Sequence, residues 1–365
     1  MNIKTLAKIT AGACGLLMPF AAFSASNGEL ALSSPQVQTA IAAQNSVTPQ
    51  LMQRAGILGT AVGANDDGTT NVKIFVDRDI ENVQSVMSAL PTQINGVPVK
   101  VELTDKFVSA IGHAPITDST TGSPHTAKQI PPIQLGTSGG WGKDLANGFC
   151  CGGTSGSLVQ IGRTQYILSN YHVFEADIVP GGNGIVAMTG DPIIQPGLID
   201  VGCNAAAAQT VATLVKKSSL PTSNVDCAIA KVVPGMVDKK GRILEIGGIS
   251  KTTVPAAIGQ AVKKSGRTTG LTTSTVTGLN ATISVTYENE CAGSTAFTKT
   301  FTGQILVANP GNVFLNGGDS GSLMVENVAR FPHAVGLLYA SSTTTAIAQP
   351  INEVLAFLGA TMVGK

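Results

Sequence analysis

The sequence predicts a mainly β protein built in two parts. From residue 148 to the C-terminus, short runs rich in Val, Ile and Thr alternate with glycine and polar turn residues. Regularly spaced short strands of this kind are typical of a sandwich or barrel, whereas βαβ units require helices between the strands. Before residue 112 the pattern differs, because apolar residues at helical spacing precede β-rich runs. The 365 residues also exceed the about 100–200 residues of a typical single domain.

Residues 1–25 are typical of a secretory signal peptide. Lys4 and Lys8 give a positively charged start, and the apolar stretch 9–23 is too short to cross a bilayer comfortably. The small residues that end this segment place the cleavage site there. We therefore expect a secreted or periplasmic protein with no stable membrane insertion after cleavage; an uncleaved anchor helix is the alternative.

Residues 26–111 predict a small α/β domain. Apolar residues recur at helical spacing within 26–56, and two of these runs begin with proline, which favours the first helical position. After them we expect two strands joined by an Asp-Gly turn, then a helix and a third strand, at 57–63, 71–76, 81–90 and 97–103.

Residues 112–139 contain Pro, Ser, Thr and Gly without apolar periodicity, which is typical of a linker. The main domain then covers 140–365. Its expected strands are 157–161, 165–169, 226–233, 272–278, 282–287, 302–307, 322–325 and 334–339, followed by a closing helix at 351–358.

The composition argues against several function classes. Charged residues make up 12% of the chain and the net charge is +1, so no broad polyanion-binding surface and no nucleic-acid partner are expected. The cysteines and histidines do not cluster with metal-ligand spacing. The Asn-Asp-Asp-Gly run at 65–68 lacks the remaining acidic ligands of a calcium loop, so we interpret it as a hairpin turn. We expect no metal and no cofactor.

Five cysteines remain after removal of the signal peptide: Cys150, Cys151, Cys203, Cys227 and Cys291. Export permits disulfide bonds, but an odd number leaves at least one thiol free or paired between chains. The spacing does not determine the pairing. We expect Cys227 to be free, because it lies in an apolar run where a small buried thiol packs well.

A Gly-Asp-Ser-Gly motif at 318–321 provides a candidate nucleophile, Ser320. A serine hydroxyl is a poor nucleophile unless a base removes its proton and hydrogen-bond donors stabilise the resulting oxyanion. The flanking glycines permit a tight turn that exposes the hydroxyl and directs the N–H groups of Gly318 and Ser320 at one point. The alternative is an ordinary polar turn, since Gly, Asp and Ser are common turn residues.

His172 and Asp226 are the candidate base and its partner. His172 lies at the end of an apolar β-run, whereas His113 and His125 fall in the predicted linker and His333 stands at the start of a strand. Asp226 begins another apolar strand, where a buried carboxylate is costly unless it is paired. An imidazole N–H meets that need. The alternatives are a structural histidine and a turn aspartate.

The three residues occur in the order His, Asp, Ser, which is the order of the chymotrypsin group and differs from those of subtilisin and the α/β-hydrolases. The local sequences at 168–173, 225–229 and 317–322 resemble the three triad motifs of chymotrypsin-like (PA clan) serine peptidases. The runs 191–197, 264–272 and 334–338 are similar to a bacterial, trypsin-like branch of that clan, and the resemblance covers about residues 148–360.

This resemblance implies a chymotrypsin-like double β-barrel with an N-terminal pro- or accessory domain. It implies a secreted serine endopeptidase that cuts protein or peptide substrates through an acyl-enzyme on Ser320. His172 would act as general base and then general acid, and Asp226 would orient the imidazole. The N–H groups of Gly318 and Ser320 would form the oxyanion hole, where one donor typically contributes about 3–4 kcal/mol. We also expect that any self-cleavage in the linker disappears in Ser320→Ala.

The resemblance further implies that Phe314, Tyr339 and Ser341 bind substrate. Phe314 stands six positions before Ser320, where trypsins carry the acidic residue that selects Lys and Arg. An apolar or small residue before the cut is therefore expected. The chain also has no Ile-Val-Gly-Gly activation terminus to pair with Asp319. Two alternatives stay open: a catalytically idle barrel that serves as a secreted binding module, and an esterase that uses the same triad.

Overall fold

The computed structural model describes residues 28–115, 123–146, 148–175, 185–287 and 296–365. The predicted signal peptide and Cys291 lie outside these ranges. Within them, no helix combines the length and apolar character needed to cross a membrane.

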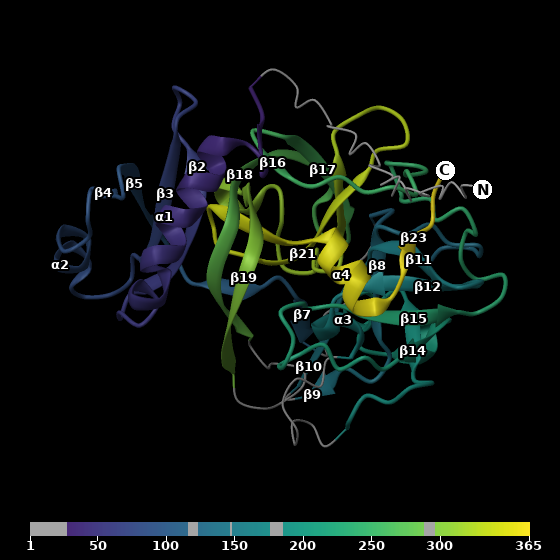
Figure 1. The fold of residues 1–365 in the computed structure, drawn as a ribbon. Helices are drawn as coiled ribbons and strands as arrows, with labels where there is room; N and C mark the ends of the chain where they lie inside the picture. Colours follow the sequence, from purple (N-terminus) through teal and green to yellow (C-terminus); the bar gives the residue numbers. More distant parts are fainter. Residues whose placement is uncertain (1–27, 116–122, 147, 176–184, 288–295) are drawn as a thin grey trace, which may run out of the picture.

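Residues 261–350 form a closed antiparallel barrel, here called the second barrel (Figure 1). Its strands are β17 (Ala261–Gly266), β18 (Gly270–Tyr287), β19 (Phe297–Ala308), β20 (Leu323–Glu326), β21 (Ala334–Ser341) and β22 (Thr345–Pro350). The strands pair in the order β17-β20-β21-β22-β19-β18, and β17 also pairs with β18, which closes the ring. The two strands predicted at 272–278 and 282–287 are one strand, β18, because the irregular register near Gly278 and Asn280 bends the strand without ending it.

The preceding part of the chain forms the first barrel. Its strands are β8 (Thr137–Trp141), β10 (Phe149–Ser155), β11 (Ser157–Ile161), β12 (Thr164–Ser169), β13 (Pro192–Gln195), β14 (Gln209–Val215) and β15 (Ala228–Val232). They pair in the order β11-β12-β15-β14-β13-β8-β10. The two ends of this path are joined at Gly156, which connects β10 directly to β11. A Cβ at Gly156 would lie 1.9 Å from the carbonyl oxygen of Gly321, so only glycine fits this contact between the barrels.

Each barrel has its own core. The core of the first includes Leu158, Ile167 and Ile229, and the core of the second includes Val262, Val307 and Leu338. The helix α4 (Ile351–Leu358), predicted at the same residues, covers the first core and ends at Gly359 with φ +63°. The predicted mainly β, double-barrel architecture is therefore confirmed.

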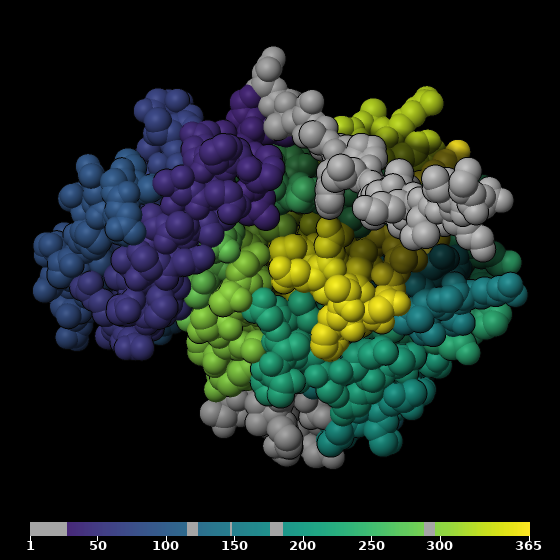
Figure 2. Space-filling model, in the orientation of Figure 1, coloured from purple at the N-terminus to yellow at the C-terminus, as the bar shows by residue number. Residues whose placement is uncertain are grey.

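The N-terminal residues form a layer of helix on sheet. It contains α1 (Pro35–Leu51), β2 (Ile57–Ala64), β3 (Thr70–Asp77), α2 (Val83–Ser88), β4 (Gln93–Ile94) and β5 (Val97–Thr104). The helix α1 buries Val37 and Ala40 among the apolar residues of β2 and β3. The sheet does not end there, because β2 pairs with β18 of the second barrel and so has no free edge on that side. Figure 2 shows this N-terminal part as a purple and blue lobe against the green surface of the second barrel.

Much of the predicted linker, 112–139, belongs to the first barrel. The strand β7 (Gly112–Pro115) pairs with β10, β8 begins at Thr137, and Ile133 and Leu135 are fully buried in the first core. Backbone pairing needs no apolar periodicity, which is why the composition of this segment did not reveal it. The domain boundaries themselves stay a prediction.

An odd number of cysteines leaves at least one of them without a disulfide partner in the same chain. Cys150 and Cys203 form a disulfide with an S–S distance of 2.02 Å, and Cys151 is also disulfide-bonded. Cys227 is free and fully buried, which confirms the prediction for this residue. Burial and the nearby charge of Asp226 raise the pKa of the Cys227 thiol well above its usual value, so this thiol stays protonated and unreactive.

Candidate active site

His172 and Asp226 meet because the strands that carry them are neighbours. His172 lies in the short helix α3 (Tyr171–Phe174), directly after β12, and Asp226 lies just before β15. These strands pair antiparallel, with Ser169 opposite Ala228. The imidazole Nδ1 of His172 lies 2.5 Å from Oδ2 of Asp226, and both side chains are buried. The predicted pair is thus in hydrogen-bond contact.

Asp226 is surrounded by hydrogen-bond donors. Its Oδ1 accepts from the backbone N–H of Tyr171 at 2.7 Å and of His172 at 3.4 Å, and its Oδ2 accepts from the hydroxyl of Tyr287 at 2.8 Å. Several donors around one buried carboxylate satisfy its oxygens and hold it in a fixed orientation. Burial, followed by the charge of Asp226, raises the pKa of Tyr287 well above its usual value, so this phenol remains a donor.

Tyr287 and Gln349 were not found by sequence reasoning. Gln349, in β22 of the second barrel, bonds both backbone groups of Asp226, accepting from its N–H at 2.7 Å and donating to its C=O at 2.8 Å. Tyr287 was assigned only to a strand. Neither residue lies in a motif, and their distances from Asp226 along the chain, 61 and 123 residues, leave no local signal.

Tyr287→Phe should remove one donor from Asp226 without changing the ring. A hydrogen bond to a charged group typically contributes about 1.5–3 kcal/mol, so we expect the free energy of unfolding to fall by that amount. Urea denaturation on a Ser320→Ala background, which lacks the candidate nucleophile, measures the change. Tyr166→Phe, a half-buried tyrosine of β12, is the control; equal stability of Tyr287→Phe and the parent would contradict the assigned bond.

The Ser320 loop is held against the same strands. Thr154 in β10 donates from its N–H to the C=O of Ser320 at 2.8 Å and from its hydroxyl to the C=O of Gly318 at 3.0 Å. The carbonyl of Thr154 in turn accepts from the hydroxyl of Ser169, three residues before His172, at 2.7 Å. One residue of the first barrel therefore ties the loop of the candidate nucleophile to the strand that carries the candidate base.

Ser320 is fully buried, whereas the sequence predicted a turn that exposes its hydroxyl. Its Oγ donates to the backbone carbonyl of Tyr339 at 3.1 Å. The Nε2 of His172 has no hydrogen-bond partner among the described residues. The loop is shaped by Gly318 and Gly321, whose φ angles of +97° and +93° favour glycine. A hydrogen bond between Ser320 and His172 thus requires the hydroxyl to turn away from Tyr339.

The other three histidines have different surroundings. His125 is buried with its Nε2 2.9 Å from an oxygen of Glu245, outside hydrogen-bond geometry, and His333 lies with its Nδ1 2.6 Å from Glu326. His113 lies in β7. The structure therefore pairs His172, and none of these three, with Asp226.

The charge of Asp319, the residue before the candidate nucleophile, is balanced by groups of the second barrel. Its carboxylate accepts from the N–H groups of Thr268 at 2.9 Å and Asn316 at 3.0 Å, and it lies 3.6 Å from the ammonium of Lys264. Both charged side chains are fully buried. Burial lowers the pKa of Lys264, and the charge of Asp319 opposes this effect. Lys264 is therefore the cation that balances the charge of Asp319.

We expect Asp319→Asn to lower the free energy of unfolding by about 3–5 kcal/mol, because it leaves the Lys264 ammonium buried without a counter-charge. Urea denaturation at pH 7 on the Ser320→Ala background measures this. The double variant Lys264→Met, Asp319→Asn should recover part of the loss, since it removes the unpaired charge. Asp66→Asn, in an exposed turn, is the control, and a loss no larger than in this control would contradict the pairing.

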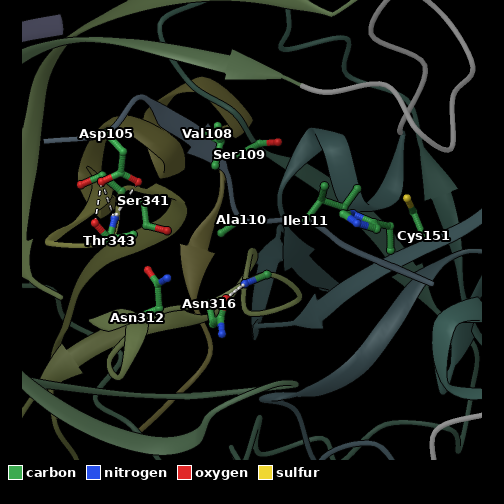
Figure 3. Close-up of a pocket in the computed structure, with 13 residues that line it drawn as sticks. Asp105, Val108, Ser109, Ala110, Ile111, Cys151, Asn312, Asn316, Ser341 and Thr343 are labelled. Carbon is green, nitrogen blue, oxygen red and sulfur yellow. Dashed lines mark hydrogen bonds between the residues drawn. The ribbon is translucent and has the colours of Figure 1, made fainter. Parts of the chain in front are cut away.

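The three predicted substrate-binding residues lie in different surroundings. Ser341 lines a cavity of about 210 Å³ together with Asn312 and Asn316 (Figure 3). Tyr339 is buried against Phe301, with a ring distance of 5.1 Å, and presents its backbone carbonyl to Ser320. The side chain of Phe314 lies in the core of the second barrel and is not part of the cavity lining. The substrate-binding role of all three stays a prediction.

No protein-family model and no curated protein sequence matches this chain. Several solved structures do. The chain is similar to bacterial serine proteases. One is a glutamic acid-specific serine protease that uses a histidine triad in substrate binding, with 20% identity and a TM-score of 0.41 over 63% of this chain and 100% of that chain. Protease A of Thermobifida fusca has 19% identity and a TM-score of 0.40, and covers 64% of this chain and 99% of its own. A chymotrypsin of Cellulomonas bogoriensis has 21% identity and a TM-score of 0.37 over the same shares.

Proposed function

We propose that this protein is a secreted serine endopeptidase with Ser320 as nucleophile, His172 as general base and Asp226 as the residue that orients the imidazole. The observation that carries the proposal is the buried contact of 2.5 Å between His172 Nδ1 and Asp226 Oδ2. A proton on Nδ1 leaves the lone pair on Nε2, the atom without a hydrogen-bond partner among the described residues. The imidazole is therefore prepared to accept a proton from a neighbouring hydroxyl.

The reaction would begin when the Oγ of Ser320 turns from the carbonyl of Tyr339 toward Nε2 of His172. Oγ then bonds to the carbonyl carbon of the substrate while its proton moves to Nε2. The N–H groups of Gly318 and Ser320 stabilise the oxyanion, and His172 returns the proton to the leaving amine as the C–N bond breaks. Water then attacks the acyl-enzyme and gives a proton to His172. His172 returns that proton to Oγ of Ser320 as the ester bond breaks.

Secretion is supported by two independent features. The sequence of residues 1–25 has the charge and apolar pattern of a signal peptide. The disulfide between Cys150 and Cys203 requires an oxidising compartment to persist.

Labelling with a fluorophosphonate probe tests the catalytic assignment. The secreted wild-type protein and the control His333→Ala should be labelled and should digest casein, whereas Ser320→Ala and His172→Ala should do neither, because the hydroxyl reacts poorly without its base. Absence of labelling and of digestion in folded wild-type protein would favour the idle binding module. Hydrolysis of small esters without any cleavage of casein or of peptides would favour the esterase.

A further inference from the structure

The segment 107–115 crosses the cleft between the barrels as an extended strand. Its first part, β6 (Phe107–Ser109), pairs antiparallel with β21, with Ser109 opposite Ala340. Its last part, β7, pairs antiparallel with β10, with Gly112 opposite Gly152. An extended peptide that adds a strand to an exposed sheet edge is a common mode of peptide recognition. Here one stretch of the chain is bound in this way by both barrels, and Ala110 and Ile111 lie between the two pairings.

The backbone of Ala110 lies against the catalytic groups. Its N–H donates to the carbonyl of Tyr339 at 2.9 Å, the same oxygen that accepts from Ser320 Oγ. Its carbonyl oxygen accepts from the N–H of Gly318 at 2.8 Å and from the N–H of Ser320 at 3.2 Å. These are the two donors assigned to the oxyanion hole. The carbonyl of Ala110 therefore occupies the position that a carbonyl under attack requires.

The side chains on both sides of this carbonyl fit the cleft. The methyl group of Ala110 is buried in the same apolar cluster as Phe314 and Leu315. On the other side, a Cβ at Gly112 would lie 2.9 Å from the Cα of Gly318, so glycine is required there. Figure 3 shows Ala110 between Ser341 of the second barrel on one side and Cys151 of the first on the other.

We propose that Ala110–Ile111 is the bond that Ser320 cuts in its own chain, and that the site accepts a small residue such as alanine before the cut. This inference rests on the proposed function. Until the cut, residues 107–113 fill the cleft and exclude other substrates, so the cut also activates the enzyme. The bond lies just before the linker predicted from the sequence, at the place where both barrels hold the backbone.

The step balances without any further reagent except water. The Oγ of Ser320 bonds to the carbonyl carbon of Ala110 and gives its proton to His172, which passes it to the nitrogen of Ile111 as the C–N bond breaks. Water then hydrolyses the ester. The products are a chain that ends in the carboxylate of Ala110, a chain that begins with the amine of Ile111, and free Ser320.

Intact mass spectrometry and N-terminal sequencing of the purified full-length protein test the proposal. Wild type should yield a chain beginning at Ile111, at a rate independent of protein concentration, and Ser320→Ala should stay uncut. Ala110→Ser should be cut, whereas Ala110→Trp should be cut at least about 10–200-fold more slowly, because the ring does not fit the cluster around Phe314. Ile111→Pro, which alters the other side of the bond and leaves the cluster intact, should also stay uncut.

A parallel casein digest and probe labelling separate the two proposals. Labelling and digestion by a wild-type protein whose new N-terminus is not Ile111 would overturn this inference and leave the proposed function standing. A cut at Ile111 that persists in Ser320→Ala would assign it to another protease and overturn it as well. A folded wild-type chain that stays uncut, unlabelled and inactive would overturn both.

Discussion

Asp226→Asn is expected to lower kcat for peptide hydrolysis about 10⁴-fold while the protein stays folded. The carboxylate accepts on both oxygens, from His172 Nδ1 on Oδ2 and from the N–H of Tyr171 on Oδ1. The amide of asparagine has one acceptor and one donor group. In either orientation its NH₂ group therefore faces one of these two donors, and that hydrogen bond is lost. With the amide nitrogen toward Nδ1, the imidazole carries its proton on Nε2 and no longer accepts one from Ser320.

Steady-state kinetics on a peptide with alanine before the cut measures this effect. The conversion to a chain beginning at Ile111 should slow by a similar factor, because the same proton transfer is required. Glu353→Gln, the same chemical change on α4, is the matched control and should keep kcat within about twofold. A kcat for Asp226→Asn close to that of this control would remove Asp226 from the mechanism.

Asp144→Asn should stabilise the protein near neutral pH by about 4 kcal/mol. Asp144 is fully buried, and neither carboxylate oxygen has a hydrogen-bond partner among the described residues. Burial raises the pKa of Asp144 from 3.8 to about 8. Because the folded state binds this proton more tightly than the unfolded state, its contribution to stability is complete below pH 3.8. It falls by about 1.4 kcal/mol per pH unit above that and is lost by pH 8.

Urea denaturation of Ser320→Ala with and without Asp144→Asn, between pH 4 and pH 8, measures this difference. The two curves should approach each other toward pH 4, where the carboxyl group is neutral in the folded state and about half protonated in the unfolded state, and should separate as the pH rises. The exposed Asp66→Asn should give no such divergence. A constant difference between the variants across this range would mean that Asp144 does not change its protonation on folding.

Several parts of this protein were predictable from short stretches of sequence. The helix at 351–358 and the strand at 157–161, a short apolar run before a turn, both have the predicted bounds. The motif at 318–321 indicated a tight turn, and Gly318 and Gly321 have the positive φ angles that such a turn needs. Turn chemistry and periodicity operate within a few residues, so the sequence contains them directly.

Contacts between distant residues were decided by the tertiary structure. Nothing near Tyr287 or Gln349 in the chain indicates Asp226 as a partner, because their approach depends on which strands of the barrels become neighbours. The pairing of β2 with β18 joins residues more than 200 positions apart and continues the sheet of the second barrel into the N-terminal layer. Strand register is fixed by such long-range packing, which local preferences do not specify.

The sequence by itself determined the chemistry available to this protein: a serine between glycines, a histidine and an aspartate at strand ends, and a small thiol in an apolar run. Only the tertiary structure decided which groups that chemistry meets. It placed the carbonyl of Ala110 on the N–H groups of Gly318 and Ser320, although Ala110 has no motif and stands about 210 residues before them. The physical reason is that an extended backbone binds wherever two sheet edges offer unpaired N–H and C=O groups, whatever its own sequence pattern.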